Sequence, residues 1–253
     1  MIEPNASRSA DESGWALFLD FDGTLVDIVD RPDAVVVDPS LTPLLSRLGE
    51  RLGGALALVS GRPIAFLDAR LGRSFDAAGL HGIEHRIAGR LSPCRPEDHP
   101  DLRQAVEGLR AHVATHDGIL IEDKGCSVAV HWRLAPERAE FARQTARAAA
   151  EALGSRYRIQ YGKAVAEILP AASGKGWVID HFLQGPPYRG RRPIFVGDDL
   201  TDEHGFGIVN ARGGVSVRIG EGESLAHLRL GTPADLRRTL SEWAAGGPCP
   251  FAV

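Results

Sequence analysis

The chain has 253 residues, of which 43% are hydrophobic and 25% are charged, and its formal net charge is −4. This composition is typical of a globular protein of one large or two modest domains, and the lack of a basic tract argues against a nucleic-acid or anionic-membrane partner. The first fourteen residues do not resemble a signal peptide, and no apolar run is long enough to span a bilayer. We therefore expect a cytoplasmic protein.

The three cysteines also favour a reducing compartment such as the cytoplasm. Cys94, Cys126 and Cys249 are far apart and form no CxxC pair. This spacing predicts neither a disulfide framework nor a zinc site, so we expect ordinary small side chains in a reducing compartment.

An apolar run at residues 15–19 leads directly into Asp20 and Asp22. Such a continuous run predicts a strand buried on both faces, as in a parallel sheet. In extended chain, residues i and i+2 point the same way, so the two carboxylates would lie about 6.6 Å apart along the strand. They would form a cation site, a shared-proton site or both. The Asp22-Gly23 pair is also a hairpin signal, but the residues that follow do not alternate as a partner strand would.

The next segments continue an α/β pattern. Residues 41–48 have helical spacing, and a second apolar run at residues 55–59 ends in Ser60-Gly61-Arg62-Pro63 before another helix. Ser60 either caps that helix or, together with free backbone N–H groups, binds phosphate. A short third strand at residues 74–78 leads into residues 79–84.

From residue 85 to residue 170 the pattern changes. A helix around residues 102–113 precedes two strands, and an alanine-rich helix at residues 136–153 precedes a second hairpin. This αββαββ order predicts an open antiparallel sheet with helices on one face and the other face free.

The free face of that sheet is predicted to be polar. In the first hairpin, Val128, Val130 and Trp132 point one way, and Ser127, Ala129, His131 and Arg133 point the other. Glu122 and Lys124 can pair with the polar set, and Glu167 in the second hairpin is a further candidate. A solvated sheet face would also be polar, but this mixture of charges suits a ligand with many hydroxyl groups.

The α/β pattern resumes with Lys175 and a helix to residue 182. A buried strand at residues 193–196 then runs into an acidic segment, residues 197–203. Carboxylates in a first helical turn complement the helix dipole, which accounts for Asp202 and Glu203 but not for Asp198. A last strand at residues 215–217 precedes a final helix that Thr232 is predicted to cap.

Strand ends that carry Asp20, Ser60 and Asp198 alternate with helices, which predicts a doubly wound parallel sheet whose carboxyl edge gathers these groups. Asp20, Asp198 and a main-chain carbonyl suffice for Mg²⁺, which prefers oxygen ligands. A magnesium ion among carboxylates, Lys175 and helix N-termini indicates phosphoryl transfer.

Residues 20–25, Ser60, Lys175 and residues 197–203 resemble the four motifs of the haloacid dehalogenase superfamily of phosphatases. The inserted αββαββ unit resembles the cap of its sugar-phosphatase branch. Within that branch the chain is similar to the trehalose-6-phosphate phosphatase family, on residues 79–84, 122–124, 131–133 and 167–170 and the double aspartate of the last motif. The resemblance implies a Rossmann-like α/β core of residues 1–84 and 171–253 and an α+β cap of residues 85–170.

The resemblance also implies roles for individual residues. Asp20 would attack phosphorus, Asp22 would act as general acid and base, and Ser60 and Lys175 would hold the phosphoryl oxygens. The Mg²⁺ site would involve Asp20, Asp22 through its main-chain carbonyl, Asp198, Asp199 and Asp202. Substrate contacts would come from Thr24, Gly61, Arg62 and His81 in the core and from Glu122, Lys124, His131, Arg133 and Glu167 in the cap.

The activity implied is Mg²⁺-dependent hydrolysis of trehalose 6-phosphate, with a trehalose-6-phosphate synthase as a functional partner. One alternative is a phosphatase of sucrose, mannosyl or hexose phosphate. From other classes, a signalling receiver domain also accepts phosphate on an aspartate at a strand end, and a catalytically silent protein would only bind sugar.

Overall fold

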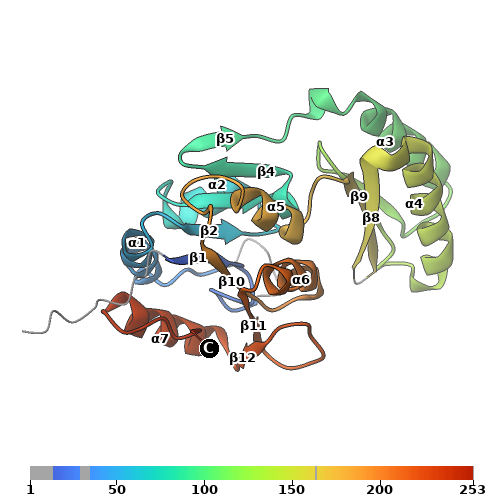
Figure 1. Ribbon diagram of the computed structural model, residues 1–253. Helices are drawn as coiled ribbons and strands as arrows, with labels where there is room; N and C mark the ends of the chain where they lie inside the picture. Colours follow the sequence, from blue (N-terminus) through green and yellow to red (C-terminus); the bar gives the residue numbers. More distant parts are fainter. Residues whose placement is uncertain (1–13, 29–34, 163, 253) are drawn as a thin grey trace, which may run out of the picture. The chain divides into compact units, whose positions relative to one another are not determined.

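A computed structural model describes residues 14–28, 35–162 and 164–252, which divide into two compact units (Figure 1). The first unit contains the chain up to Ser92 and from Gly174 onward, and the second is Pro93–Ser173. Residues 85–92 were expected in the inserted unit. They belong to the first unit instead, because they form two antiparallel strands that extend its sheet.

The first unit is built on an eight-stranded sheet with the order β12-β11-β10-β1-β2-β3-β4-β5. Its strands are β1 (Trp15–Leu19), β2 (Leu56–Val59), β3 (Asp76–Gly79), β4 (Glu84–Ile87), β5 (Arg90–Ser92), β10 (Arg192–Gly197), β11 (Val215–Ile219) and β12 (Leu228–Leu230). All neighbours from β12 to β3 are parallel. The strand order reverses direction at β1, so β1 and β10 border the switch point at which such sheets bind ligands. The predicted doubly wound sheet is confirmed.

Helices cover both faces of this sheet (Figure 1). One face carries α1 (Leu41–Arg51), α2 (Ile64–Leu71) and α7 (Pro233–Ala244), and the other carries α5 (Lys175–Phe182) and α6 (Glu203–Ala211). Leu17 and Leu19 pack with the first group and Phe18 packs with the second. The strand at residues 15–19 is therefore buried on both faces, as its apolar run predicts.

The second unit has an antiparallel sheet with the order β6-β7-β9-β8. Its elements are α3 (Pro100–Val113), β6 (Leu120–Asp123), β7 (Val128–His131), α4 (Ala139–Leu153), β8 (Tyr157–Gly162) and β9 (Val165–Pro170). Val128, Val130 and Trp132 pack with residues of α3 and α4 in one core. The predicted αββαββ unit is confirmed, with α3 and α4 packed on one face of its sheet. No helix within the described ranges is both long enough and apolar enough to cross a bilayer.

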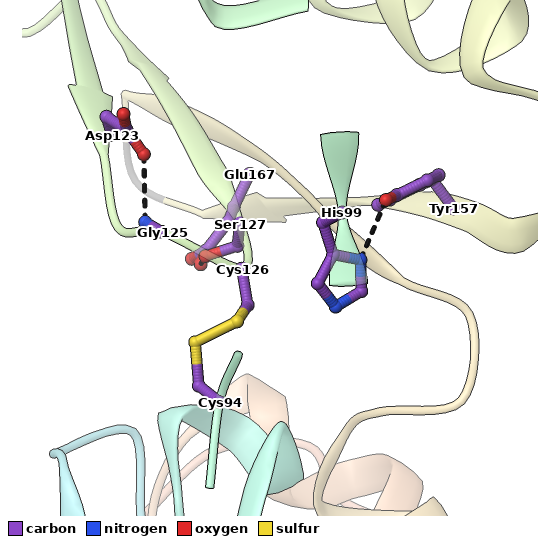
Figure 2. Close-up of a disulfide and its surroundings, with 8 residues drawn as sticks. All are labelled: Cys94, His99, Asp123, Gly125, Cys126, Ser127, Tyr157 and Glu167. Carbon is purple, nitrogen blue, oxygen red and sulfur yellow. Dashed lines mark hydrogen bonds between the residues drawn. A yellow bond between two sulfur atoms is a disulfide. The ribbon is translucent and has the colours of Figure 1, made fainter. Parts of the chain in front are cut away.

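Cys94 and Cys126 form a disulfide in this second unit (Figure 2). Cys94 lies near the start of the unit, and Cys126 lies in the turn between β6 and β7. The expectation of unpaired cysteines is therefore wrong for this pair. Their separation of 32 residues carries no local signal, and only the tertiary fold brings them together. The predicted cytoplasmic location stays a prediction.

Candidate active site

The first candidate site lies in the first unit, where β1 and β10 end side by side. Asp20 follows β1, and Asp198 follows β10. The Thr24 hydroxyl lies 3.1 Å from Asp20 Oδ2 and 3.2 Å from Asp198 Oδ1. Thr24 is fully buried and bonds to both strand ends, and its predicted substrate contact stays a prediction.

Gly23 allows this close approach. Its φ angle is +75°, and a Cβ atom at this position would lie 2.2 Å from Asp198 Oδ2. The chain turns immediately after β1, because the Phe21 carbonyl accepts the N–H groups of Leu25 and Val26. Only glycine satisfies both the left-handed backbone and the lack of space beside Asp198.

Lys175 is the cation of the cluster. Its Nζ donates to Asp20 Oδ1 at 2.7 Å and to Asp202 Oδ1 at 2.6 Å, and none of the three side chains is more than 5% exposed. Burial raises the pKa of Asp20 to about 6, with Lys175 opposing the shift and Asp198 adding to it. Burial also raises the pKa of Asp202 to about 6. Burial alone would lower the pKa of Lys175, but the two carboxylates outweigh it and raise that pKa.

The carboxylates fit a divalent cation. Asp20, Asp198 and Asp202 each offer an oxygen within 4.8 Å of the others. Three carboxylates against one ammonium leave the cluster negative when all are ionised, and a hard cation with oxygen ligands would offset that charge. Neither Asp199 nor the Asp22 carboxylate belongs to this group among the described residues.

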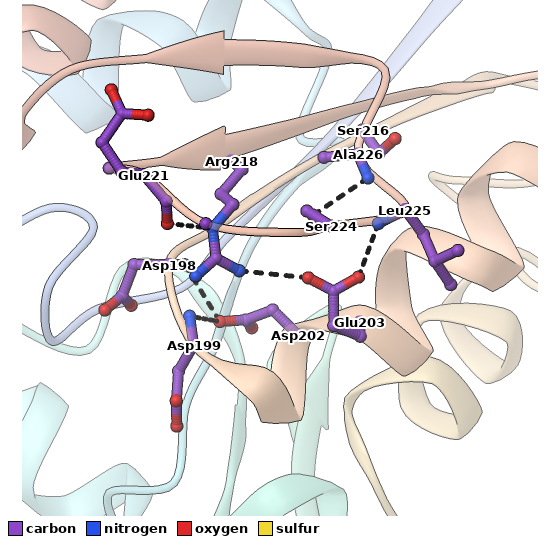
Figure 3. Close-up of polar contacts among 12 residues, drawn as sticks. Asp198, Asp199, Asp202, Glu203, Ser216, Arg218, Glu221, Ser224, Leu225 and Ala226 are labelled. Carbon is purple, nitrogen blue, oxygen red and sulfur yellow. Dashed lines mark hydrogen bonds and ion pairs between the residues drawn. The ribbon is translucent and has the colours of Figure 1, made fainter.

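Asp202 differs from Asp20 and Asp198 in the hydrogen bonds that its carboxylate makes. Its Oδ1 is bonded to Lys175, and its Oδ2 accepts the backbone N–H groups of Asp198 at 3.1 Å and Asp199 at 2.9 Å (Figure 3). Both oxygens are thus engaged in shaping the loop after β10. Asp20 and Asp198 fit direct coordination of a metal, and Asp202 fits a supporting position.

The helix that follows this loop is fixed at its first residue. Glu203 Oε1 lies 3.1 Å from Arg218 of β11, and Glu203 Oε2 accepts the Leu225 N–H at 2.8 Å (Figure 3). These contacts hold the start of α6 against the neighbouring strand. The loop with Asp198 is therefore anchored on both sides.

The Asp22 carboxylate points to Arg62. Arg62 Nε donates to Asp22 Oδ2 and Arg62 Nη2 donates to Asp22 Oδ1, both at 2.8 Å. Strand β1 ends at Leu19 and a turn closes on the Phe21 carbonyl, so the predicted side-by-side placement of Asp20 and Asp22 stays a prediction, although both side chains line one cavity. Asp20 binds Lys175 and Asp22 binds Arg62, so their environments differ.

The end of β2 supplies the remaining side of the site. Ser60 is almost fully buried, and its Oγ accepts the Arg62 N–H at 3.0 Å. It does not cap α2, whose N-cap is Pro63. A cavity of about 410 Å³ is lined by Asp20, Asp22, Ile28, Ser60, Gly61, Arg62, His81, Lys175, Asp198, Asp199 and Thr201. It thus collects most of the core residues selected from the sequence, and adds Ile28 and Thr201.

A second set of candidates lies in the second unit, on the sheet face opposite α3 and α4. Strand register places Glu122, Ala129, Glu167 and Gln160 in one row from β6 to β8. Glu167 Oε2 lies 3.1 Å from Lys124 Nζ, and its Oε1 accepts the Ser127 hydroxyl at 2.6 Å. This carboxylate is thus held on both oxygens, and the Lys124 side chain crosses β7 to reach it.

The remaining polar residues of this face differ in their contacts and in their exposure to solvent. His131 Nε2 lies 2.8 Å from Glu122 Oε2. Arg133 follows the end of β7 and is exposed. Arg158 and Gln160 of β8 were not selected from the sequence, although alternation places them on the same face as Glu167. The sequence predicts the hairpin of β8 with β9 but not its register, so it did not place them beside Glu167.

A family model described as trehalose-phosphatase matches residues 18–230. The chain belongs to this family. It is 47% identical over 217 residues to a probable trehalose-phosphate phosphatase of Sinorhizobium fredii, covering 85% of this chain and 81% of that protein. It is 39% identical over 239 residues to the trehalose-6-phosphate phosphatase of Escherichia coli, covering 93% of this chain and 89% of the relative.

Solved structures agree with the family. The structure of Aspergillus fumigatus trehalose-6-phosphate phosphatase gives a TM-score of 0.73 at 25% identity, over 92% of this chain and 94% of that one. A trehalose-6-phosphate phosphatase related protein gives 0.72 at 26% identity, over 91% and 97%. The resemblance to the haloacid dehalogenase superfamily is confirmed, and so is the enzyme class, a phosphoric monoester hydrolase. The receiver-domain alternative is not supported.

Proposed function

We propose that this enzyme hydrolyses trehalose 6-phosphate to trehalose and inorganic phosphate through an aspartyl-phosphate intermediate, with Mg²⁺ as cofactor. The observation that carries the proposal is the buried contact of 2.7 Å between Lys175 and Asp20 at the end of β1. It places a carboxylate with a fixed orientation and a cation at the switch point of the sheet. A phosphate bound there would meet both a nucleophile and a counter-charge.

In the first step, an oxygen of Asp20 attacks phosphorus, and the bond from phosphorus to the sugar oxygen breaks. Asp22 gives a proton to that oxygen, so trehalose leaves as a neutral alcohol. Both oxygens of Asp22 accept from Arg62 in the structure, so Asp22 must leave Arg62 before it can face the sugar oxygen. The incoming phosphate is a stronger anionic partner for Arg62 and would draw it away.

In the second step, Asp22 accepts a proton from water, and the water oxygen attacks phosphorus. The bond from phosphorus to Asp20 breaks, which releases phosphate and restores the carboxylate. Lys175 and Ser60 hold phosphoryl oxygens in both steps. Asp20 and Asp198 would hold Mg²⁺, which when bound supplies positive charge to the transferring phosphoryl group.

The inserted unit would select the sugar. A disaccharide offers hydroxyl groups and little apolar area, so discrimination depends on hydrogen bonds that the wrong sugar leaves unpaired. Glu122, Lys124, His131 and Glu167 provide donors and acceptors on the face opposite α3 and α4, with Arg133 at its edge. The names of the relatives in Sinorhizobium and Escherichia support trehalose phosphate as the ester. A trehalose-6-phosphate synthase would supply it.

The test is phosphate release from trehalose 6-phosphate, with Mg²⁺ and after EDTA, beside sucrose, mannosyl and hexose phosphates. Trehalose 6-phosphate should be the best substrate, EDTA should stop the reaction, and Mg²⁺ should restore it. Asp20→Asn should abolish turnover, because an amide oxygen is a poor nucleophile, while Asp117→Asn, an exposed change, should not. A better rate on another sugar phosphate would reject the substrate, and an active Asp20→Asn enzyme would reject the mechanism.

A further inference from the structure

The turn between β3 and β4 has an unusual backbone. Leu80 and His81 are consecutive and neither is glycine, yet both have left-handed φ angles, of 50° and 56°. Such conformations are uncommon for side chains with a Cβ atom and persist only where the surroundings hold them. His81 is the one residue of this turn that the sequence predicts to contact substrate.

The contacts that hold this turn lead to the phosphate-binding segments of the proposed site. The Leu80 N–H donates to the Arg62 carbonyl at 3.1 Å, and the His81 N–H donates to the Ser60 carbonyl at 3.1 Å. The His81 carbonyl accepts the Gly174 N–H at 2.5 Å. Gly174 immediately precedes Lys175. One strained turn thus joins two segments of the site that are more than a hundred residues apart in the chain.

Glu84 adds a side-chain bond to the same assembly. Its Oε1 accepts the N–H of Ile64, the first residue of α2, at 2.6 Å. Helix α2 has Pro63 at its N-cap and no side-chain cap hydrogen bond of its own. The Glu84 carboxylate therefore supplies the acceptor that a capping residue would supply, at the positive end of the helix.

Gly79 makes this bond possible. It lies opposite Glu84 in the β3–β4 register, and a Cβ atom there would lie 2.7 Å from Ile64 N and 2.7 Å from Glu84 Oε1. The same atom would lie 2.8 Å from the Arg62 carbonyl oxygen. The carboxylate thus reaches α2 through the space that any side chain at residue 79 would fill.

We propose that Glu84 is a positioning residue for the phosphoryl group of the substrate, an inference that rests on the proposed function. By holding the start of α2 to the β3–β4 turn, it fixes the loop from Ser60 to Arg62 against Lys175. Glu84 lines no part of the cavity, so it acts through that loop. The group affected is the phosphate, which every substrate of the enzyme shares.

Two conservative variants separate the hydrogen bond from the charge. Glu84→Gln keeps an acceptor oxygen at the same reach and removes the charge, whereas Glu84→Asp keeps the charge and withdraws the acceptor by one methylene. Glu84→Ala removes both. Glu50→Ala, an exposed change on α1, is the matched control. For each we would measure kcat and KM with trehalose 6-phosphate and with p-nitrophenyl phosphate, and the inhibition constant of inorganic phosphate.

Loss of the hydrogen bond should weaken phosphate binding about tenfold. We expect Glu84→Ala and Glu84→Asp to raise the phosphate inhibition constant and both KM values by that factor, equally for the two substrates. Glu84→Gln should stay within about twofold of the parent. If Glu84→Ala does not fold, the phosphate inhibition constants of Glu84→Gln and Glu84→Asp still test the proposal.

An unchanged inhibition constant in Glu84→Asp would overturn the proposal, as would a loss confined to trehalose 6-phosphate or a Gln variant as poor as Asp. Failure of the proposed substrate would look different. The parent would then turn over p-nitrophenyl phosphate but not trehalose 6-phosphate, and the phosphate inhibition constants would still report on Glu84.

Discussion

Lys175 Nζ lies 2.7 Å from Asp20 Oδ1, although the two residues are 155 positions apart, and both side chains are almost fully buried. The second oxygen of Asp20 faces the Thr24 hydroxyl. Each oxygen of the carboxylate therefore has a defined neighbour. Asp20, the proposed nucleophile, is thus held in one orientation before any substrate arrives, which would lower the entropic cost of the attack.

Replacing Lys175 with methionine should damage both activity and stability. The variant leaves the Asp20 and Asp202 carboxyls buried without their cation, so we expect the free energy of unfolding to fall by about 3 kcal/mol. Turnover of trehalose 6-phosphate should fall by about a thousandfold, because one charge on the phosphoryl group is no longer offset. Phosphate release and urea denaturation measure the two effects.

Arg212→Met is the control for this variant. It breaks a more exposed ion pair with Asp180 and should change stability by less than about 1 kcal/mol. A Lys175→Met enzyme with parental stability would contradict the buried ion pair, and one with parental turnover would contradict its catalytic use.

The raised pKa of Asp20 predicts opposite pH effects without and with magnesium. The folded carboxyl binds its proton more tightly, with a pKa of about 6 against an ordinary aspartate value of 3.8. Its contribution to stability is therefore fully present below pH 3.8 and is lost as pH rises toward 6 in metal-free protein. A cation competes with that proton, so stabilisation by Mg²⁺ should grow from pH 5 to pH 7.5.

Thermal unfolding with and without Mg²⁺ across this pH range measures the effect. The Asp20→Asn variant is the control, because its amide does not titrate, and its response to Mg²⁺ should be weaker and flatter with pH. A stabilisation by Mg²⁺ that is as large at pH 5 as at pH 7.5 would contradict the competition.

Those parts of the site that follow from strand order alone were predicted from the sequence. Parallel strands end at the same edge of a sheet, so Asp20, Ser60 and Asp198 could be placed together from strand order alone. The direction of Asp22 depends on a turn closed by Leu25 and Val26 and on an arginine forty residues away. Neither contact follows from periodicity, so the pairing of Asp22 with Arg62 was not predicted.

In the second unit, the sequence did not predict strand register or the tertiary contacts between distant residues. Alternation separates Val128 and Val130 from the polar face, and the core confirms it. The row that joins Glu167 to Gln160 depends on the register of the predicted second hairpin, and the pairing of Cys94 with Cys126 depends on tertiary contacts. Strands β4 and β5, at one end of the large sheet, were missed because they are short and largely polar.

Glu167→Gln should separate sugar recognition from phosphoryl transfer. The amide keeps one acceptor but loses the charge that binds Lys124 and the Ser127 hydroxyl. We expect kcat/KM for trehalose 6-phosphate to fall by about a hundredfold, because several charge-assisted hydrogen bonds weaken together. The rate with p-nitrophenyl phosphate, which has no sugar, should change by less than about twofold.

Glu151→Gln, an exposed change on α4, is the matched control and should leave both rates unchanged. Equal losses on the two substrates in Glu167→Gln would mean that this face does not read the sugar.

The disulfide predicts a redox-dependent stability of the inserted unit. A cross-link that closes a loop of 32 residues restricts the unfolded chain and is worth about 3–4 kcal/mol in the chain-entropy description. The Cys94→Ser/Cys126→Ser double variant should therefore unfold at a lower temperature than the oxidised parent. Parent protein treated with dithiothreitol should match the double variant, because both lack the same bond. Thiol titration after denaturation without reductant should find one thiol in the parent, from Cys249, and three thiols without reductant would refute the disulfide.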